Sequence, residues 1–382
     1  MAARSRPVVR TAAFGSGLRQ AWIDHEALAR APTDRVSKRR VKKSLRVLVL
    51  FDTDGEPPAS VSQDWKKQIE STDEAEFDVA RALISKGHEV RLFGFRDSLD
   101  HLTAGLRAEP ADVVFNLSER FRGKSSLDYT VAALLEMLGL PYTGASSEGL
   151  MLARDKSLTK KVFAYQGIRI PHFMVCPRAA AVQRPSDLRF PLIVKPLDED
   201  ASVGIAQASV VRDDDALKER VNFIHEKIKT DAIVEEFIAG RELYIGVMGN
   251  DRPLPLPPIE MVFGNDTTVE SRIATFKAKW SVRYREGRGI QNMVAKNLSE
   301  DVRVRLAEVA VRAYEAAGLH EYGRIDIRLA HDDAIYVVEA NPNPYLAEGE
   351  DLAWAAEEAG YGYPDFIEKI AEMALSRHAL RG

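Results

Sequence analysis

Hydrophobic and charged residues alternate strictly after Tyr322, and this alternation predicts a short β-strand. It places Arg324 and Asp326 on one face of that strand, opposite a row of aliphatic residues. A polar turn follows, and the near-continuous apolar run over residues 335–338 predicts a second strand. The two strands predict an antiparallel hairpin that ends in a Pro-Asn-Pro segment.

The end of this hairpin carries candidate chemistry. An antiparallel partner strand would bring Glu339 and Asn341 onto the face of Arg324 and Asp326. Carboxylate and amide oxygens are ligands that Mg²⁺ prefers, Mg²⁺ bridges nucleotide phosphates, and an arginine can stabilise developing negative charge. The alternative is a charged hairpin on a solvated face, and by pattern alone the two interpretations are equally supported.

Strands and helices alternate in the first third of the chain. Residues 45–51 are a predicted buried strand, residues 74–86 an amphipathic helix, and residues 88–93 and 111–116 two further strands. This order predicts a parallel sheet with helices on its faces. The chain has neither a Gly-x-Gly-x-x-Gly fingerprint nor a Walker-type phosphate loop, so we do not expect a dinucleotide binder.

Composition narrows the class of protein. The 382 residues, 29% charged and 45% hydrophobic, are typical of a soluble globular protein of two or three domains. No apolar run approaches ~20 residues, so no membrane partner is expected. The formal net charge of −4 argues against nucleic-acid binding through a basic surface. The single cysteine, Cys176, excludes an intrachain disulfide and suits the reducing cytoplasm, where we expect the protein to act.

Residues 1–44 differ from the rest, with eleven Lys and Arg against three Asp and Glu. They contain no apolar core of a secretory signal. We expect a peripheral basic extension that packs on the body of the protein or on a second subunit, as in a homodimer.

Several segments between the first domain and the hairpin carry candidate nucleotide contacts. Lys156 follows Asp155 at the start of a predicted helix, and Lys195 ends a short apolar strand, an unusual place for a surface lysine. The loop 197–205 is rich in small residues, which allow backbone N–H groups to approach phosphate oxygens. Residues 234–238 offer an acceptor and a donor on extended backbone between apolar side chains, as an adenine pocket requires.

The amino-acid sequences of these segments resemble those of a known family. RIDIRL followed by VVEANPNP, together with LLEMLGLPYTG and VEEFIAGRE, is similar to the D-alanine–D-alanine ligase group of the ATP-grasp ligases. The resemblance covers about residues 45–376. It implies an α/β fold with a flavodoxin-like N-terminal domain (45–155), a small central α/β domain (156–234) and a C-terminal antiparallel-sheet domain (235–382).

The resemblance also implies a role for individual residues. ATP would be bound by Lys156, Lys195, Ser202, Glu235, Ile238, Glu242 and Lys279. Two Mg²⁺ ions, or Mn²⁺ in their place, would be bound by Asp326, Glu339 and Asn341. Arg324 would stabilise the tetrahedral adduct, and the substrates would contact Trp280, Tyr345 and Glu350. Lys279 would also meet the γ-phosphate as a catalytic residue.

Departures from the family pattern gather at the substrate positions. Glu350 stands where the family has a serine that holds the carboxylate of the second D-alanine, and Tyr345 replaces a glycine. Ala201 and Trp280 replace residues whose hydroxyls the family directs at the first substrate. Because a glutamate repels a carboxylate at close range, we expect a substrate other than two D-alanines, with an amine that carries a cation or lacks a carboxylate at this point. The alternative is that Glu350 turns outward.

The implied reaction is ADP-forming ligation of a small carboxylate to a small amine, amino-acid or peptide-like, through an acylphosphate. Two other functions fit the same motifs. One is an ATP-binding regulator that has lost ligation. The other is an ATP-grasp ligase that modifies a macromolecule, with residues 1–44 as a docking arm.

Overall fold

The computed structural model describes residues 44–54, 74–108, 110–178, 180–199, 202, 204–264 and 272–381. The predicted basic extension, apart from Ser44, lies outside the described residues, as do Asp200 and Ala201 of the predicted phosphate loop. No helix among the described residues is long and apolar enough to cross a membrane.

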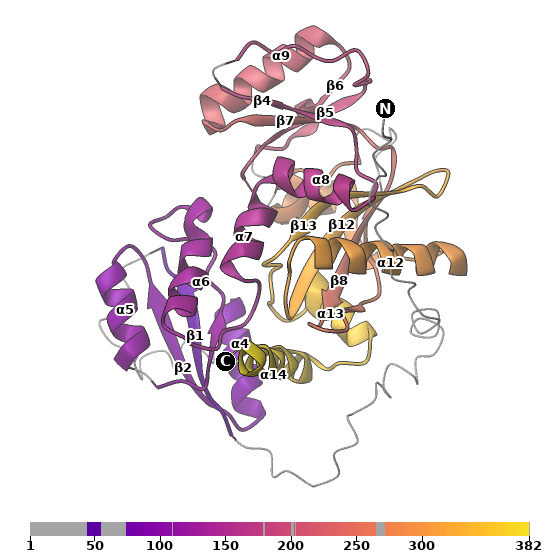
Figure 1. Ribbon diagram of the computed structural model, residues 1–382. Helices are drawn as coiled ribbons and strands as arrows, with labels where there is room; N and C mark the ends of the chain where they lie inside the picture. The colour runs from indigo at the N-terminus through magenta and orange to yellow at the C-terminus, as the bar shows by residue number, and fades with distance from the viewer. Residues whose placement is uncertain are drawn as a thin grey trace, which may run out of the picture.

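The N-terminal part is built on three parallel strands in the order β2-β1-β3, as the sequence predicts. They are β1 (Arg46–Asp52), β2 (Glu89–Phe95) and β3 (Val113–Asn116), and around them lie α4 (Ala75–Ser85), α5 (Leu99–Ala108), the 3₁₀ turn η1 (Ser125–Leu127) and α6 (Asp128–Met137). The apolar face of α4 buries Phe77, Val79 and Leu83 against the sheet. Figure 1 shows this unit in indigo and purple, with α5 and α6 beside the strands.

The central part is a four-stranded antiparallel sheet in the order β4-β7-β5-β6. Its strands are β4 (Phe173–Cys176), β5 (Leu192–Pro196), β6 (Val210–Val211) and β7 (Ala232–Glu236), covered by α9 (Asp214–Phe223) with the short turns η2 (Gln207–Ser209) and η3 (Ile224–Ile228). Helices α7 (Ser147–Arg154) and α8 (Lys156–Tyr165) connect it to the N-terminal sheet.

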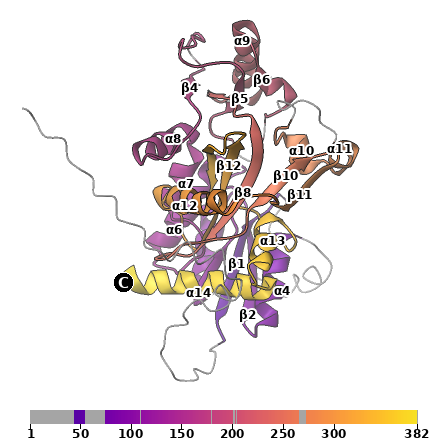
Figure 2. The same ribbon diagram turned by 90° about the vertical axis from the view of Figure 1, so that its right-hand side faces the viewer.

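The C-terminal part is a larger sheet in the order β11-β10-β8-β12-β13, with β9 paired to β8. It comprises β8 (Gly240–Met248), β9 (Leu254–Pro255), β10 (Ile259–Phe263), β11 (Ile290–Val294), β12 (Tyr322–Ala330) and β13 (Ile335–Asn341). Its helices are α10 (Phe276–Trp280), α11 (Val282–Arg288), α12 (Glu300–Ala316), α13 (Asp351–Glu358) and α14 (Tyr363–Arg381). Figure 2 shows α14 running across the base of the molecule, where it packs on α4.

The predicted hairpin is confirmed as β12 and β13. Arg324 pairs with Asn341 and Asp326 with Glu339, so all four side chains share one face, as the alternation requires. Strand β8 pairs with the other edge of β12 and places Tyr244 opposite Asp326. The site therefore spans three strands.

Two further features of the C-terminal part are fixed by side-chain contacts. Helix α14 continues to Arg381, and its second half is anchored by Arg377, which pairs with the buried Glu321 at 2.8 Å. The basic segment 275–289 forms two short helices, with Thr275 and Ser281 as N-caps.

Candidate active site

A buried group of charges lies between the central sheet and α8. Ile193 pairs with Glu235 on neighbouring strands β5 and β7, so Lys195, two residues further along β5, shares the face of Glu235. Lys195 Nζ donates a hydrogen bond of 3.1 Å to Glu235 Oε2. Burial opposes ionisation of Glu235, but the lysines beside it lower its pKa below the ordinary value. Glu235 is therefore a carboxylate at neutral pH.

Lys160 completes this group and was not among the residues assigned a role from the sequence. Its side chain is 1% exposed, its Nζ donates to Val338 O at 2.8 Å, and it lies 3.4 Å from Glu235 Oε1. Burial lowers the pKa of Lys160, against the raising effect of Glu235. The sequence signal that could have identified Lys160 is its position four residues after Lys156, which places both lysines on the same face of α8.

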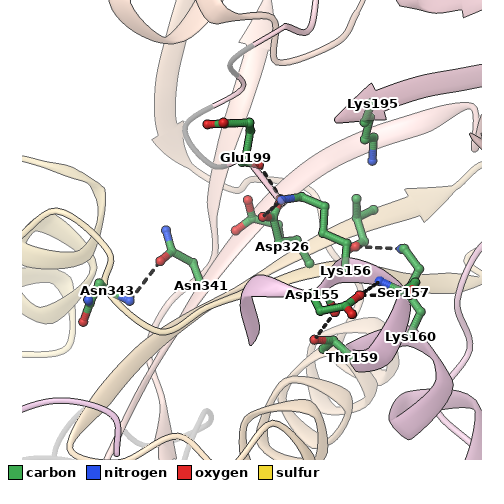
Figure 3. Close-up of polar contacts among 12 residues, drawn as sticks. Asp155, Lys156, Ser157, Thr159, Lys160, Lys195, Glu199, Asp326, Asn341 and Asn343 are labelled. Atoms are coloured by element: carbon green, nitrogen blue, oxygen red, sulfur yellow. Dashed lines mark hydrogen bonds and ion pairs between the residues drawn. The ribbon is translucent and has the colours of Figure 1, made fainter. Parts of the chain in front are cut away.

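Lys156 is held at the first position of α8 by a local cap. Asp155 Oδ1 accepts hydrogen bonds from the backbone N–H groups of Ser157 and Leu158, both at 2.9 Å. Lys156 Nζ then donates to the backbone oxygen of Glu199 at 2.5 Å and lies 3.3 Å from Glu339 Oε1. Figure 3 shows Lys156 reaching from the helix toward the loop that carries Glu199, with Lys195 on the strand above.

The hairpin contributes an arginine and two carboxylates. Arg324 donates two hydrogen bonds to Asp326, at 2.7 and 3.0 Å, and its guanidinium lies 4.6 Å from the centre of the Tyr244 ring. Burial alone would raise the pKa of Glu339, but the ammonium groups of Lys156, Lys279 and Lys195 lower it to about 2. Three cations thus converge on one carboxylate, which is the field that a polyphosphate requires.

The predicted metal ligands come together as the sequence suggested. Asp326 and Glu339 are paired across the hairpin, and Asn341 lies two residues beyond Glu339 on the same face. Asn341 Oδ1 accepts the backbone N–H of Asn343 at 3.0 Å. Among the described residues there is no cluster of three or more His, Cys, Asp and Glu that could hold a metal, and the predicted donor set has two carboxylates and an amide. All-oxygen donors of this kind fit Mg²⁺.

A narrow cavity of about 70 Å³ lies between the central and C-terminal sheets. Its wall includes the predicted nucleotide contacts Lys195, Ser202, Glu235, Ile238, Glu242 and Lys279. Glu235 Oε1 is buried and accepts no hydrogen bond among the described residues, although Lys160 Nζ lies 3.4 Å from it. Glu242 is held by Arg328 Nη2 at 3.0 Å and accepts the hydroxyl of Tyr244 at 3.0 Å. Neither Arg328 nor Tyr244 was assigned a role from the sequence. Each lies two residues along its strand from an assigned residue, Asp326 or Glu242, and therefore on the same face.

A larger cavity of about 690 Å³ borders the same face of the hairpin, toward the end that carries Arg324 and Asn341. The predicted substrate contacts Trp280, Tyr345 and Glu350 lie in its wall, together with Arg324 and Asn341. Lys279 and Glu339 line both cavities, so the two spaces meet at these residues. A phosphoryl group passing from one space to the other would pass between a lysine and the carboxylate end of the hairpin.

Helix α10 carries Lys279, which lies at this junction. Thr275 Oγ1 caps it by accepting the N–H of Ala278 at 3.1 Å, and the N–H of Phe276 donates to Ile205 O at 3.2 Å. The helix is thereby joined to the loop that carries Ser202 in the wall of the narrow cavity. This position presents Lys279 to both spaces.

Comparisons with known proteins agree with this geometry. A family model described as the D-ala D-ala ligase C-terminus matches residues 161–372. The D-alanine–D-alanine ligase of Bordetella petrii is 32% identical over 305 residues, covering 79% of this chain and 87% of that protein. The uncharacterized protein y4sG of Sinorhizobium fredii is also 32% identical over 305 residues, covering 78% of this chain and 87% of its own length.

A solved structure shares the fold. The D-alanine–D-alanine ligase from Bacillus anthracis complexed with ATP aligns with a TM-score of 0.68 at 22% identity, over 89% of this chain and 100% of that one.

Proposed function

Because this chain belongs to the D-alanine–D-alanine ligase-like family of ATP-grasp enzymes and is a ligase that forms a C–N bond, we propose that it uses ATP and Mg²⁺ to join a small carboxylate to a small amine other than D-alanine. The observation that carries the proposal is the junction of two cavities at Lys279 and Glu339. One cavity has the donors and acceptors for a nucleotide, and the other has an arginine and open space for two organic substrates.

ATP is proposed for the narrow cavity. The buried oxygen Glu235 Oε1 suits the exocyclic amine of adenine, which is a hydrogen-bond donor, and the backbone at Ile238 suits a ring nitrogen. Glu242 would accept ribose hydroxyls. The ammonium groups of Lys156, Lys195 and Lys279 would bind phosphate oxygens, since they already supply the field that keeps Glu339 ionised.

Asp326, Glu339 and Asn341 are the residues that would hold Mg²⁺, which supplies neutralisation of phosphate charge when bound. In the structure Arg324 lies against Asp326 and Lys156 against Glu339.

The chemistry of ligation requires little covalent help from the protein. Transfer of the γ-phosphoryl group to the substrate carboxylate gives an acylphosphate, and the amine attacks its carbonyl with loss of phosphate. Arg324 is the proposed stabiliser of the negative charge that develops on the carbonyl oxygen, because it lies in the cavity wall and is fixed by Asp326 and Tyr244. Helix α10 would limit access of water, which would otherwise hydrolyse the acylphosphate.

Two departures in the larger cavity oppose D-alanine as the second substrate. Glu350 and Asp351 lie side by side in its wall, and burial together with Asp351 raises the pKa of Glu350. A substrate carboxylate at this point would add a third negative charge, which is unfavourable. Tyr345 is the second departure and occupies space that a glycine would leave open.

The test is a screen of amino acids and dipeptides for ADP formation, run beside D-alanine alone. We expect ADP formation that depends on a carboxylate and an amine together, and little product from D-alanine. Glu350→Ser should raise the turnover of D-alanine, whereas Glu357→Ser, an exposed acid on the same helix, should leave it unchanged. Efficient D-alanyl-D-alanine formation by the wild-type protein would contradict the proposed specificity. ATP binding with no amine-stimulated ADP formation would favour a regulatory protein instead.

A further inference from the structure

Three residues from separate elements form a charged bridge in the wall of the larger cavity. Asn292 of β11 lies between Arg285 of α11 and Asp351 of α13. Its Oδ1 accepts a hydrogen bond from Arg285 Nη2 at 3.4 Å, and its Nδ2 donates to Asp351 Oδ1 at 2.6 Å. All three residues line the cavity.

The two charges at the ends of this bridge are not paired with each other. Among the described residues, neither Arg285 nor Asp351 takes part in an ion pair within 4 Å. Arg285 also donates a hydrogen bond to a neutral group, Ala278 O, at 3.0 Å. An uncharged asparagine thus holds a cation and an anion apart in a substrate-sized space, although direct pairing would satisfy both.

Glu350 adds a second carboxylate at the acidic end. It is the N-cap residue of α13, immediately before Asp351, and it lines the same cavity as Arg285 and Arg324. Burial and Asp351 raise the pKa of Glu350, and the two arginines act in the opposite direction. One end of the cavity therefore presents two carboxylates and, one amide away, a guanidinium.

We propose that this wall binds the head group of an α-amino acid, with its ammonium on Asp351 and Glu350 and its carboxylate on Arg285, and that the amine substrate is a diamino acid. The α-ammonium and α-carboxylate of an amino acid are separated by one carbon, and the two charges of the wall are separated by one amide. The inference rests on the proposed ligase function, whose substrate class it specifies.

The head group cannot also be the nucleophile. Two carboxylates favour the protonated form of the α-amine, and an ammonium has no lone pair with which to attack a carbonyl. A second amine on the same molecule, in its neutral form, would form the C–N bond. The C–O bond of the acylphosphate would break, inorganic phosphate would leave with the electron pair, and the new amide nitrogen would lose one proton.

The test compares amines that differ by one charged group. ADP formation is measured with a fixed carboxylate donor and with lysine, with cadaverine, which lacks the carboxylate, and with 6-aminohexanoate, which lacks the α-amine. Ornithine and 2,4-diaminobutyrate extend the series to shorter chains. We expect kcat/KM for the best diamino acid to exceed that of its two truncated analogues by roughly ten- to a hundredfold, the effect of losing a charge-assisted hydrogen bond.

Matched variants locate the effect in the wall. Asp351→Asn keeps the acceptor for Asn292 and removes only the charge, so it should weaken discrimination against the analogue without an α-amine, because Glu350 then holds the ammonium alone. Arg285→Gln should abolish discrimination against cadaverine, and Arg285→Lys should restore part of it. Arg283→Gln, an exposed arginine on the same helix, should change neither ratio.

Different results would overturn the diamino-acid assignment and the ligase proposal. If ADP forms with some amines but the ratios are near one, or if the variants retain the wild-type ratios, the diamino-acid assignment is overturned while ligation stands. If no amine stimulates ADP formation, the ligase proposal fails. Calorimetry with lysine, cadaverine and 6-aminohexanoate in the presence of a non-hydrolysable ATP analogue still decides the head-group site, because equal or absent binding of all three excludes it.

Discussion

Replacing Glu235 by glutamine should strongly destabilise the protein, because the change removes one charge and leaves two buried lysines facing each other. Glu235 is 1% exposed and lies 3.1 Å from Lys195 and 3.4 Å from Lys160. At an effective dielectric constant of about 20, each contact corresponds to roughly 5 kcal/mol of attraction. Desolvation of the three charges offsets most of this, and removing one partner of a buried ion pair costs about 3–5 kcal/mol.

A second substitution makes the reasoning specific. Lys160→Met removes the more deeply buried ammonium, so adding it to Glu235→Gln should recover part of the lost stability. The double variant is thus expected to be more stable than Glu235→Gln alone, although each single change destabilises. Lys161→Met, on the exposed side of the same helix, is the matched control and should produce no recovery.

Urea denaturation at pH 7, followed by tryptophan fluorescence, measures the free energies of unfolding of the wild type, Glu235→Gln, Lys160→Met, the double variant and the Lys161→Met controls. Coincident unfolding of the domains is first checked with circular dichroism, because a multidomain protein need not unfold in one step. If the Glu235→Gln and Lys160→Met effects simply add, the two side chains do not interact and the buried charge group has been misinterpreted.

Three further outcomes are expected at the same site. Lys195→Ala should weaken ATP binding on the order of ten- to a hundredfold through loss of a charge-assisted contact, measured by calorimetry with Lys161→Ala as control; unchanged affinity would reject the nucleotide site. Glu339→Gln should abolish ADP formation at ordinary Mg²⁺ while the circular dichroism spectrum stays native, because an amide cannot supply the carboxylate charge; near-wild-type turnover would refute its assignment as a metal ligand. Lysines lower the pKa of Glu235, so its stabilising contribution should be complete above pH about 4.3 and decline on further acidification; a stability difference between wild type and Glu235→Gln that is constant from pH 7 to pH 3 would contradict this.

Local sequence patterns were sufficient for the elements that carry the site. Period-two alternation after Tyr322 predicted the strand and the shared face of Arg324 and Asp326, because side chains of a strand point alternately to its two sides. A continuous apolar run ending in Lys195 predicted a buried strand with a functional lysine at its end, and the Asp155–Lys156 pair predicted the start of a helix. In each case the information lies within a few residues of the chain.

Contacts between distant segments could not be read in this way. Lys160 and Glu235 are 75 positions apart, and nothing in either local pattern indicates that their side chains meet in a space closed to water. The bridge from Arg285 through Asn292 to Asp351 depends on how two helices and a strand of different parts of the chain approach one another. The second half of α14 is similarly held by Glu321, which lies just before β12 and 56 positions before Arg377.

The sequence by itself therefore determined the parallel sheet, the hairpin with its predicted oxygen ligands on one face, and, through its motifs, the family and its antiparallel C-terminal sheet. Only the tertiary structure decided which lysines share one carboxylate, that the narrow and the larger cavity meet at Lys279 and Glu339, and that two opposite charges in the cavity wall are kept apart. The physical reason is that backbone hydrogen bonding and hydrophobic periodicity are local, whereas burial and electrostatic pairing depend on distances through space between residues remote in the chain.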